Sequence, residues 1–314
     1  PTIAYCSITN NEAAQGGGLN IDLTSLSAGQ QLLIQGTTIS DNTSVGYAGG
    51  IRANLGSADL RFEGCTIQNN ISNPTQVNGN YLAGGVYYSG TDGRMVLTNS
   101  QVIDNTSYSR CSSTACSVTN RGGGIFAEGD LEVINSIIRG NLAWAIDASA
   151  GGFENNYSYG AGIYQNTGAL TATNSIISHN QGNPGGTHAY PYGSGIYLNS
   201  GTADLTNCTL AYNEQEGIRN NAGTATVVNS IIFFNTGLQV AGTVDVTYSD
   251  VQDGYTGEGN IAINPVFGSD TDLIIVPGSP CIDAGNADAQ YNDGCLPLAL
   301  GTQRNDMGAH GGPG

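Results

Sequence analysis

Residues 193–213 read GSGIYLNSGTADLTNCTLAYN, and this phrase recurs with substitutions from the first residues to about residue 235. The segment that ends the phrase occurs in eight copies, each closing on an asparagine: Asn11, Asn42, Asn70, Asn105, Asn141, Asn180, Asn213 and Asn235. These asparagines lie 31, 28, 35, 36, 39, 33 and 22 residues apart by subtraction. The shortest interval leaves room for little beyond three short strands, so one repeat predicts one coil of a solenoid.

Apolar residues alternate with polar ones inside each repeat, as Ala203 and Leu205 do, whereas helical repeats of this length need apolar residues at i, i+3 and i+4. A second strand carries an apolar residue three positions before each asparagine: Ile8, Ile39, Ile67, Val102, Ile138, Ile177, Leu210 and Ile232. We therefore expect an all-β protein, a parallel β-helix whose coils stack about 4.8 Å apart.

The asparagines are expected to close a turn and to hydrogen-bond from coil to coil through their side-chain amides, as a ladder. A row of ligand-binding asparagines is the alternative. Residues 1–237 are predicted to form about eight coils, and residues 238–314 the last coils and an irregular C-terminal cap of the same domain, since an open end would expose strand edges. The chain opens at Pro1 inside a repeat, as expected of a mature product or an excised fragment.

The C-terminal part carries five short motifs: VTYSDVQDG at 246–254, GEGNI at 257–261, NPVF at 264–267, SPCIDAGN at 279–286 and RNDMGAHGGPG at 304–314. Together they resemble the terminal signature of bacterial secreted right-handed parallel β-helix repeat proteins. The resemblance implies a right-handed β-helix and an extracellular or cell-surface setting. It transfers no catalytic residue, because such proteins have mixed or unknown activities.

Composition restricts the partners. The chain has 8 basic residues, all arginine, against 25 acidic ones, which gives a net charge of −17. So acidic a surface repels nucleic acid and anionic membranes, and no segment approaches the length of a membrane span. We therefore predict no nucleic-acid partner and no membrane insertion.

The seven cysteines suggest an oxidising compartment. Cys6, Cys65 and Cys208 share a repeat position with serine and threonine and are expected to be buried free thiols. Two coils separate Cys6 from Cys65, which exceeds the Cα separation of about 7 Å that a disulfide tolerates. The predicted bridges are Cys111–Cys116 and Cys281–Cys295.

Catalytic groups are scarce. A uronate lyase needs a strong base and cations or Ca²⁺, but the chain lacks lysine and its arginines are spread over different coils. A glycoside hydrolase needs two carboxylates about 5–9.5 Å apart. The local pairs are Glu128 with Asp130, Asp147 with Glu154, and Glu214 with Glu216, and we expect them to be solvated turn residues. The three histidines lack metal-ligand spacing, so no metal or cofactor is predicted, and Ca²⁺ has no support.

One repeat position is aromatic. The residue after the first inward apolar residue that follows Gly-Gly is, on six successive coils, Arg52, Tyr87, Phe126, Tyr164, Tyr197 and Arg219. Alternation sends this stripe outward, beside loops of variable length that add Trp144, Tyr190 and Tyr192. We expect a platform for a neutral polysaccharide or an interface for other protein chains. The alternative is mutual stacking of the rings beneath the loops.

These observations predict an extracellular or cell-surface protein with a structural, adhesive or assembly role, binding a neutral glycan or a partner chain along the stripe. A polysaccharide-active enzyme, a glycoside hydrolase before a lyase, is the alternative. Five Asn-x-Ser/Thr sequons matter only in a glycosylating host: Asn42, Asn70, Asn105, Asn156 and Asn207.

Overall fold

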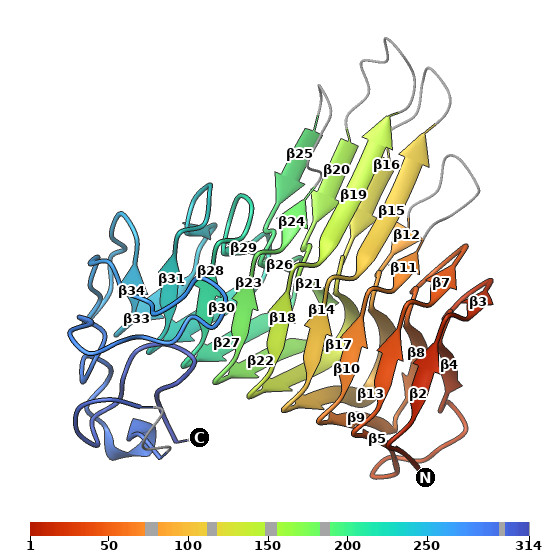
Figure 1. Cartoon of the computed structure of the whole chain (residues 1–314), viewed down its shortest axis with the longest axis horizontal. Coiled ribbons are helices and arrows are strands. Elements are labelled where there is room, and N and C mark those ends of the chain that lie inside the picture. Colours follow the sequence, from red (N-terminus) through yellow and green to blue (C-terminus); the bar gives the residue numbers. More distant parts are fainter. Residues whose placement is uncertain (73–80, 112–117, 148–155, 183–188, 295–298, 314) are drawn as a thin grey trace.

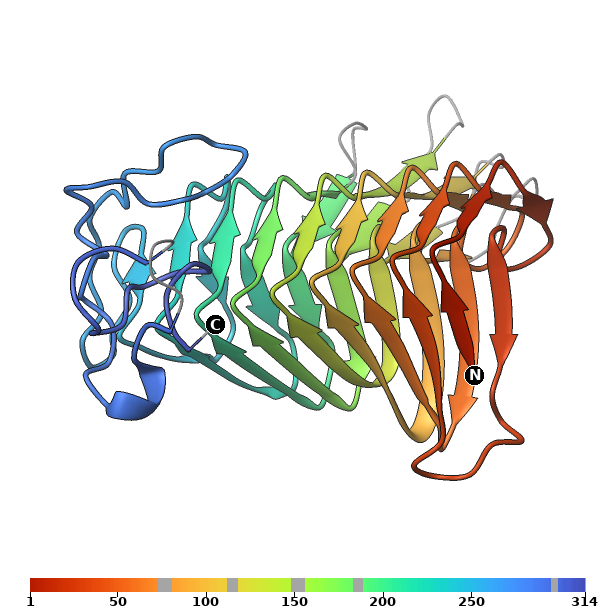
Figure 2. The same cartoon turned by 60° about the horizontal axis from the view of Figure 1, so that its bottom comes forward.

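The computed structural model describes residues 1–72, 81–111, 118–147, 156–182, 189–294 and 299–313. Within these ranges the protein is all-β: its single helix is the short 3-10 turn η1 (Ala289–Tyr291). None of the described helices is long and apolar enough to cross a membrane. The strands stack along one axis, with irregular structure at the C-terminal end (Figures 1 and 2).

The strands form four sheets, and every pairing between named strands is parallel. Sheet A has fifteen strands: β1 (Thr2–Ala4), β4 (Leu19–Asp22), β5 (Gln31–Gln35), β8 (Ile51–Gly56), β9 (Asp59–Glu63), β13 (Val86–Thr98), β17 (Ile125–Ile134), β21 (Ile163–Thr167), β22 (Ala169–Thr173), β26 (Ile196–Leu198), β27 (Thr202–Thr206), β29 (Ile218–Asn220), β30 (Thr224–Val228), β32 (Val240–Ala241) and β33 (Asp245–Thr247). Sheet B has nine: β2 (Ser7–Thr9), β6 (Thr38–Ser40), β10 (Thr66–Gln68), β14 (Gln101–Ile103), β18 (Ile137–Arg139), β23 (Ile176–Ser178), β28 (Thr209–Ala211), β31 (Ile231–Phe233) and β34 (Asp250–Val251).

The loops of variable length supply the other two sheets. Sheet C contains β3 (Glu12–Ala13), β7 (Thr43–Ser44), β11 (Ile71–Ser72), β15 (Thr106–Cys111), β19 (Leu142–Asp147) and β24 (Gln181–Gly182). Sheet D contains β12 (Tyr81–Leu82), β16 (Val118–Arg121), β20 (Asn156–Tyr159) and β25 (Ala189–Tyr192). We call sheets C and D the flange, whose long strands β15, β16, β19 and β20 project from the middle coils (Figure 1).

The predicted columns are confirmed by strand register. Ile39 of β6, Ile67 of β10 and Val102 of β14 are direct partners, and their fully buried side chains belong to one continuous hydrophobic core. The inward residues of sheet A, such as Leu60 and Met95, join the same core. Long parallel sheets stacked on a shared core are consistent with a β-solenoid.

The asparagine ladder has the predicted geometry. The Asn105 backbone N–H and Nδ2 donate to Asn141 Oδ1 at 3.1 and 3.0 Å, and Asn141 Nδ2 donates to Val102 O at 2.9 Å and to Asn180 Oδ1 at 3.0 Å. The second glycine of each Gly-Gly pair lies against the ladder, since a Cβ at Gly85 would sit 3.1 Å from the side-chain amide of Asn105. The ladder is therefore structural.

The C-terminal residues pack against the last coils. Ile231 and Phe233 of β31 form an apolar cluster with Ile275, Cys281 and Met307. The backbone N–H of Gly308 also donates to the carbonyl of Asn229 at 2.8 Å. The segment thus covers the outer side of sheet B.

One cysteine prediction, that for Cys6, is wrong. Cys281 is buried and its Sγ lies 3.2 Å from Asp250 Oδ2. Its expected partner Cys295 lies outside the described residues, so the Cys281–Cys295 bridge stays a prediction. Cys6 is exposed, because its strand region lies in the first coil and has no coil stacked on one side. Cys65 and Cys208 are buried free thiols as predicted. Cys295, Cys116 and the side chain of Cys111 lie outside the described residues.

Candidate functional site

The predicted stripe exists as a column of neighbouring residues on sheet A. Tyr87, Phe126, Tyr164 and Tyr197 are direct partners on successive strands. Their consecutive ring centroids lie 5.4, 5.1 and 5.3 Å apart with interplanar angles of 18° or less. Each ring therefore stacks on the next, and Tyr47 stacks on Tyr87 at one end.

The stripe is not an open platform. Phe126, Tyr164 and Tyr197 are only 2, 4 and 7% exposed, because Tyr159 and Tyr192 of the flange pack over them. The expectation that these three rings offer their faces to a ligand is wrong. Mutual stacking beneath the loops, the alternative, describes the structure, since the loops form sheet D and cover the rings.

The other predicted site residues are not gathered at one place. Trp144 lies in sheet C, edge-to-face with Tyr108, and belongs to no cluster with the stripe. Arg52 donates from Nη1 to Asn20 Oδ1 at the N-terminal end of the stripe. Tyr192 and Arg219 meet at its C-terminal end, where the Arg219 guanidinium lies 4.7 Å from the Tyr192 ring centroid. Tyr190 stacks on Tyr157 and is 38% exposed.

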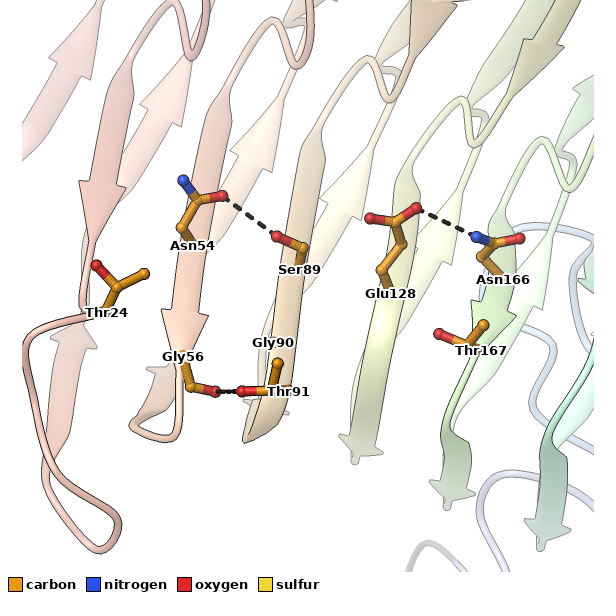
Figure 3. A pocket seen from close by; sticks show the side chains of 9 residues that line it. All are labelled: Thr24, Asn54, Gly56, Ser89, Gly90, Thr91, Glu128, Asn166 and Thr167. Atoms are coloured by element: carbon orange, nitrogen blue, oxygen red, sulfur yellow. Dashed lines mark hydrogen bonds between the residues drawn. The ribbon is translucent and has the colours of Figure 1, made fainter.

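Beside the stripe runs a groove that sequence reasoning missed (Figure 3). Its volume is about 390 Å³, and its lining residues are Thr24, Asn54, Gly56, Ser89, Gly90, Thr91, Glu128, Asn166 and Thr167. Asn54, Ser89, Glu128 and Asn166 each follow a stripe residue by two positions, so strand alternation places them on the same outer face. That periodicity was the signal in the sequence that could have found them.

The groove side chains hold one another in place across coils. Ser89 Oγ donates to Asn54 Oδ1 at 3.2 Å, and Asn166 Nδ2 donates to Glu128 Oε1 at 3.2 Å (Figure 3). Asn199 Nδ2 continues the row by donating to Asn166 Oδ1 at 3.0 Å. The amides and hydroxyls are thus positioned on strands before any ligand arrives.

Glu128 is the one charged residue among those that line the groove. The Tyr87 hydroxyl donates to Glu128 Oε2 at 3.0 Å, and burial, with the carboxylate beside it, raises the pKa of Tyr87 to about 12. Asp130, the expected partner of Glu128, lines a separate depression with Arg94 and Glu132 instead. The two carboxylates therefore do not share a pocket.

The remaining carboxylate pairs do not form a shared pocket either. Glu216 is buried, accepts the Gly193 N–H and pairs with Arg219, whereas Glu214 is half-buried with its pKa raised by burial. Glu154 and the side chain of Asp147 lie outside the described residues. Across the described ranges, no three His, Cys, Asp or Glu side chains gather in a way that could hold a metal ion.

The five sequon asparagines are all buried in the folded chain: Asn42, Asn70, Asn105, Asn156 and Asn207. The first three belong to the ladder, and Asn207 Nδ2 donates to Asn305 Oδ1 at 3.1 Å. None of these amides is accessible for modification once the chain has folded.

Comparison with known proteins adds no relative: no protein-family model, no curated protein and no solved structure matches this chain.

Proposed function

We propose that this protein is an extracellular or cell-surface right-handed parallel β-helix with a structural, adhesive or assembly role, which binds a neutral glycan in the groove beside the stripe. The observation that carries the proposal is the row of amide and hydroxyl side chains fixed across successive coils. Sugar hydroxyls both donate and accept hydrogen bonds, as Asn, Ser and Thr side chains do. A row fixed in advance loses little conformational entropy on binding.

Charge favours a neutral ligand. The protein carries a net charge of −17, and Glu128 is the only carboxylate lining the groove. A polyanion would be repelled by the protein as a whole, while a neutral chain would meet no such barrier.

The aromatic residues contribute through their edges. Stacking between coils occupies the ring faces of the stripe, so hydroxyl groups such as that of Tyr87 are what the stripe presents toward the groove. Recognition would then depend on hydrogen bonds rather than on the stacking of sugars against rings.

Two features support the right-handed coiling and the extracellular or cell-surface setting that we propose. Parallel crossover connections are right-handed in about 98% of cases, which favours a right-handed helix. The C-terminal motifs resemble those of secreted bacterial repeat proteins, and the buried sequons are compatible with a host that does not glycosylate them.

Binding to a glycan array, with reducing-end release measured on the same glycans, tests the proposal. Asn166→Ala should weaken binding of a neutral glycan about tenfold, the equivalent of about 1.4 kcal/mol. Asn20→Ala is the matched control, because it removes the same amide from an exposed position of β4 outside the groove. Equal affinity of the two variants would refute the groove as the binding site.

The enzyme alternative gives a different result in the same experiment. Release of reducing ends that Glu128→Gln abolishes would show that the groove is a hydrolytic site. Binding without release, retained in part by Glu128→Gln, supports the binding function, since the one amide oxygen can still accept from either Tyr87 or Asn166.

A further inference from the structure

A second concavity lies where the flange meets sheet A. Its volume is about 270 Å³, and we call it the tyrosine notch, lined by Tyr157, Tyr159, Tyr192, Tyr197, Arg219 and Asn221. Tyr157, Tyr159 and Tyr192 come from sheet D, whereas Tyr197 and Arg219 are direct partners on β26 and β29 of sheet A. The notch therefore exists only because the flange folds down beside the coils.

Four phenol rings crowd this notch. The Tyr159 ring centroid lies 5.9 Å from that of Tyr157, 5.6 Å from that of Tyr192 and 4.9 Å from that of Tyr197. No hydroxyl of the four is hydrogen-bonded to another residue that the structure describes. Burial, with the neighbouring phenols, raises the pKa of Tyr159 to about 12, so its proton stays in place at neutral pH. The hydroxyls remain available as hydrogen-bond donors.

The Arg219 side chain is held in a fixed orientation at the notch by Glu216. Its Nε and Nη2 both donate to Glu216 Oε1, and Glu216 Oε2 in turn accepts the Gly193 N–H. This arrangement fixes the guanidinium over Tyr192 and leaves Nη1 without a partner among the described residues. Glu216 is buried beneath the arginine and does not line the notch.

The electrostatic surroundings of the notch differ from those of the groove. Burial raises the pKa of Tyr197, and both Arg219 and Arg121 act in the opposite direction. Arg121 also lies 5.8 Å from the Tyr164 ring centroid and forms no ion pair within the described ranges. Two of the eight basic residues of the chain thus adjoin a notch with no carboxylate in its lining.

We propose that the tyrosine notch binds an oxyanion, a carboxylate or sulfate group carried by the bound ligand. Phenol hydroxyls, the free Nη1 of Arg219 and the amide of Asn221 can all donate to such a group. Charge-assisted hydrogen bonds from a guanidinium are about twice as strong as neutral ones, and its planar shape suits carboxylates and sulfates.

The notch is connected to the groove. Asn221 Nδ2 donates to Asn199 Oδ1 at 3.4 Å, and Asn199 Nδ2 donates to Asn166 Oδ1 at 3.0 Å, so one row of amides leads from the groove to the notch. This step rests on the proposed function: a largely neutral glycan in the groove would place one acidic or sulfated sugar in the notch.

The first test needs no glycan. The intact chain is titrated with sodium sulfate and, separately, with sodium acetate at constant ionic strength, and the resonances of Arg219 and of the notch tyrosines are followed by NMR. We expect saturable shifts with a dissociation constant on the order of 1 mM. The binding should weaken at least tenfold in Arg219→Gln. Arg61→Gln, which removes the same charge from an outer position of β9, should leave it unchanged.

Tyr192→Phe guards against a folding artefact, because it keeps the ring that stacks on Tyr159 and removes only the hydroxyl. A severalfold weaker sulfate affinity in this variant supports the notch. Absence of saturable binding of either anion, or equal binding in the parent and Arg219→Gln, overturns the inference.

The second test compares neutral oligosaccharides with the same oligosaccharides bearing one uronic acid or one sulfate ester. Tighter binding of an acidic member, lost in Arg219→Gln, supports the inference and identifies which group the notch takes. If neutral glycans bind through Asn166 but acidic ones gain nothing, the inference fails and the proposed function stands. If sulfate binds through Arg219 but no glycan binds, the notch stands and the proposed function fails.

Discussion

Asn141→Ala tests how far the asparagine ladder stabilises the solenoid. Asn141 Oδ1 is the acceptor for both the backbone N–H and the Nδ2 of Asn105, and its own Nδ2 donates to Val102 O and Asn180 Oδ1. Both Asn105 and Asn141 are fully buried, so water cannot replace what the substitution removes.

The structure sets the size of the effect. The Asn105 N–H loses its acceptor, which costs about 1–3 kcal/mol for a buried donor. Asn105 Nδ2 keeps its bond to Ile67 O, and Asn180 Oδ1 keeps the Asn141 backbone N–H, so these two groups lose only part of their bonding. Adding about 1 kcal/mol for the remaining bonds gives an expected loss of about 2–4 kcal/mol.

Urea unfolding followed by circular dichroism measures this loss as a shift of the midpoint at constant slope. Asn11→Ala is the matched control. Asn11 belongs to the same ladder, but it is exposed in the first coil, and its side chain donates to Asn42 Oδ1 without accepting from any described residue. Its loss should stay below about 1 kcal/mol. Asn141→Asp separates hydrogen bonding from packing, since a carboxylate of equal shape would face the acceptors Val102 O and Asn180 Oδ1 and should destabilise at least as much as alanine. Equal midpoints for Asn141→Ala and Asn11→Ala would refute the reasoning.

Three further predictions concern stability and accessibility. Burial raises the pKa of Asp250 from 3.8 to about 6 in the folded protein, so ionised Asp250 destabilises the fold increasingly as pH rises through this range, and fully above it. Asp250→Asn should therefore raise the free energy of unfolding by about 1–3 kcal/mol at pH 7.5 and by little at pH 4. An equal gain at both pH values would contradict this. Tyr164→Ala with Tyr197→Ala should lower the free energy of unfolding by several kcal/mol, because both rings are buried under the flange. An unchanged free energy of unfolding would show that the flange does not pack on them. Cys6 should react with a maleimide in the native protein, whereas Cys208 should react only after unfolding. Mass spectrometry of labelled peptides measures both reactions, and rapid labelling of native Cys208 would refute its burial.

The periodic part of this fold could be predicted from the sequence because each coil repeats the same local requirement. An apolar residue three positions before the asparagine, such as Ile138, must point into the core on every coil, so its column and register follow from spacing alone. The asparagine ladder followed in the same way, as did the alignment of the stripe residues on neighbouring strands.

The parts that could not be predicted depend on contacts between segments that do not repeat. Nothing in the periodicity of Tyr159 or Tyr192 indicates that their loops pair as sheet D and fold onto Tyr164 and Tyr197. Exposure of Cys6 depends on whether a coil precedes it, which its own repeat does not encode. Cys281 has a carboxylate partner from a distant strand, Asp250, and cysteine spacing carries no information about that contact.

Stacking along the solenoid axis also decides what the surface can recognise. A column of aromatic rings, such as Tyr164 on Tyr197, is stabilised when each ring stacks on the next. The ring faces are then covered by neighbouring rings, and only the ring edges with their hydroxyls can contact a ligand. A column of amides behaves differently, because Asn166 bonds to Glu128 and Asn199 while keeping hydrogen-bonding capacity directed outward. The same repetition that builds the core thus converts an aromatic stripe into structure and leaves the neighbouring polar row as the surface suited to binding. The flange does not follow the repeat, and it places tyrosine hydroxyls beside Arg219. The repeating coils alone would not bring these hydrogen-bond donors together.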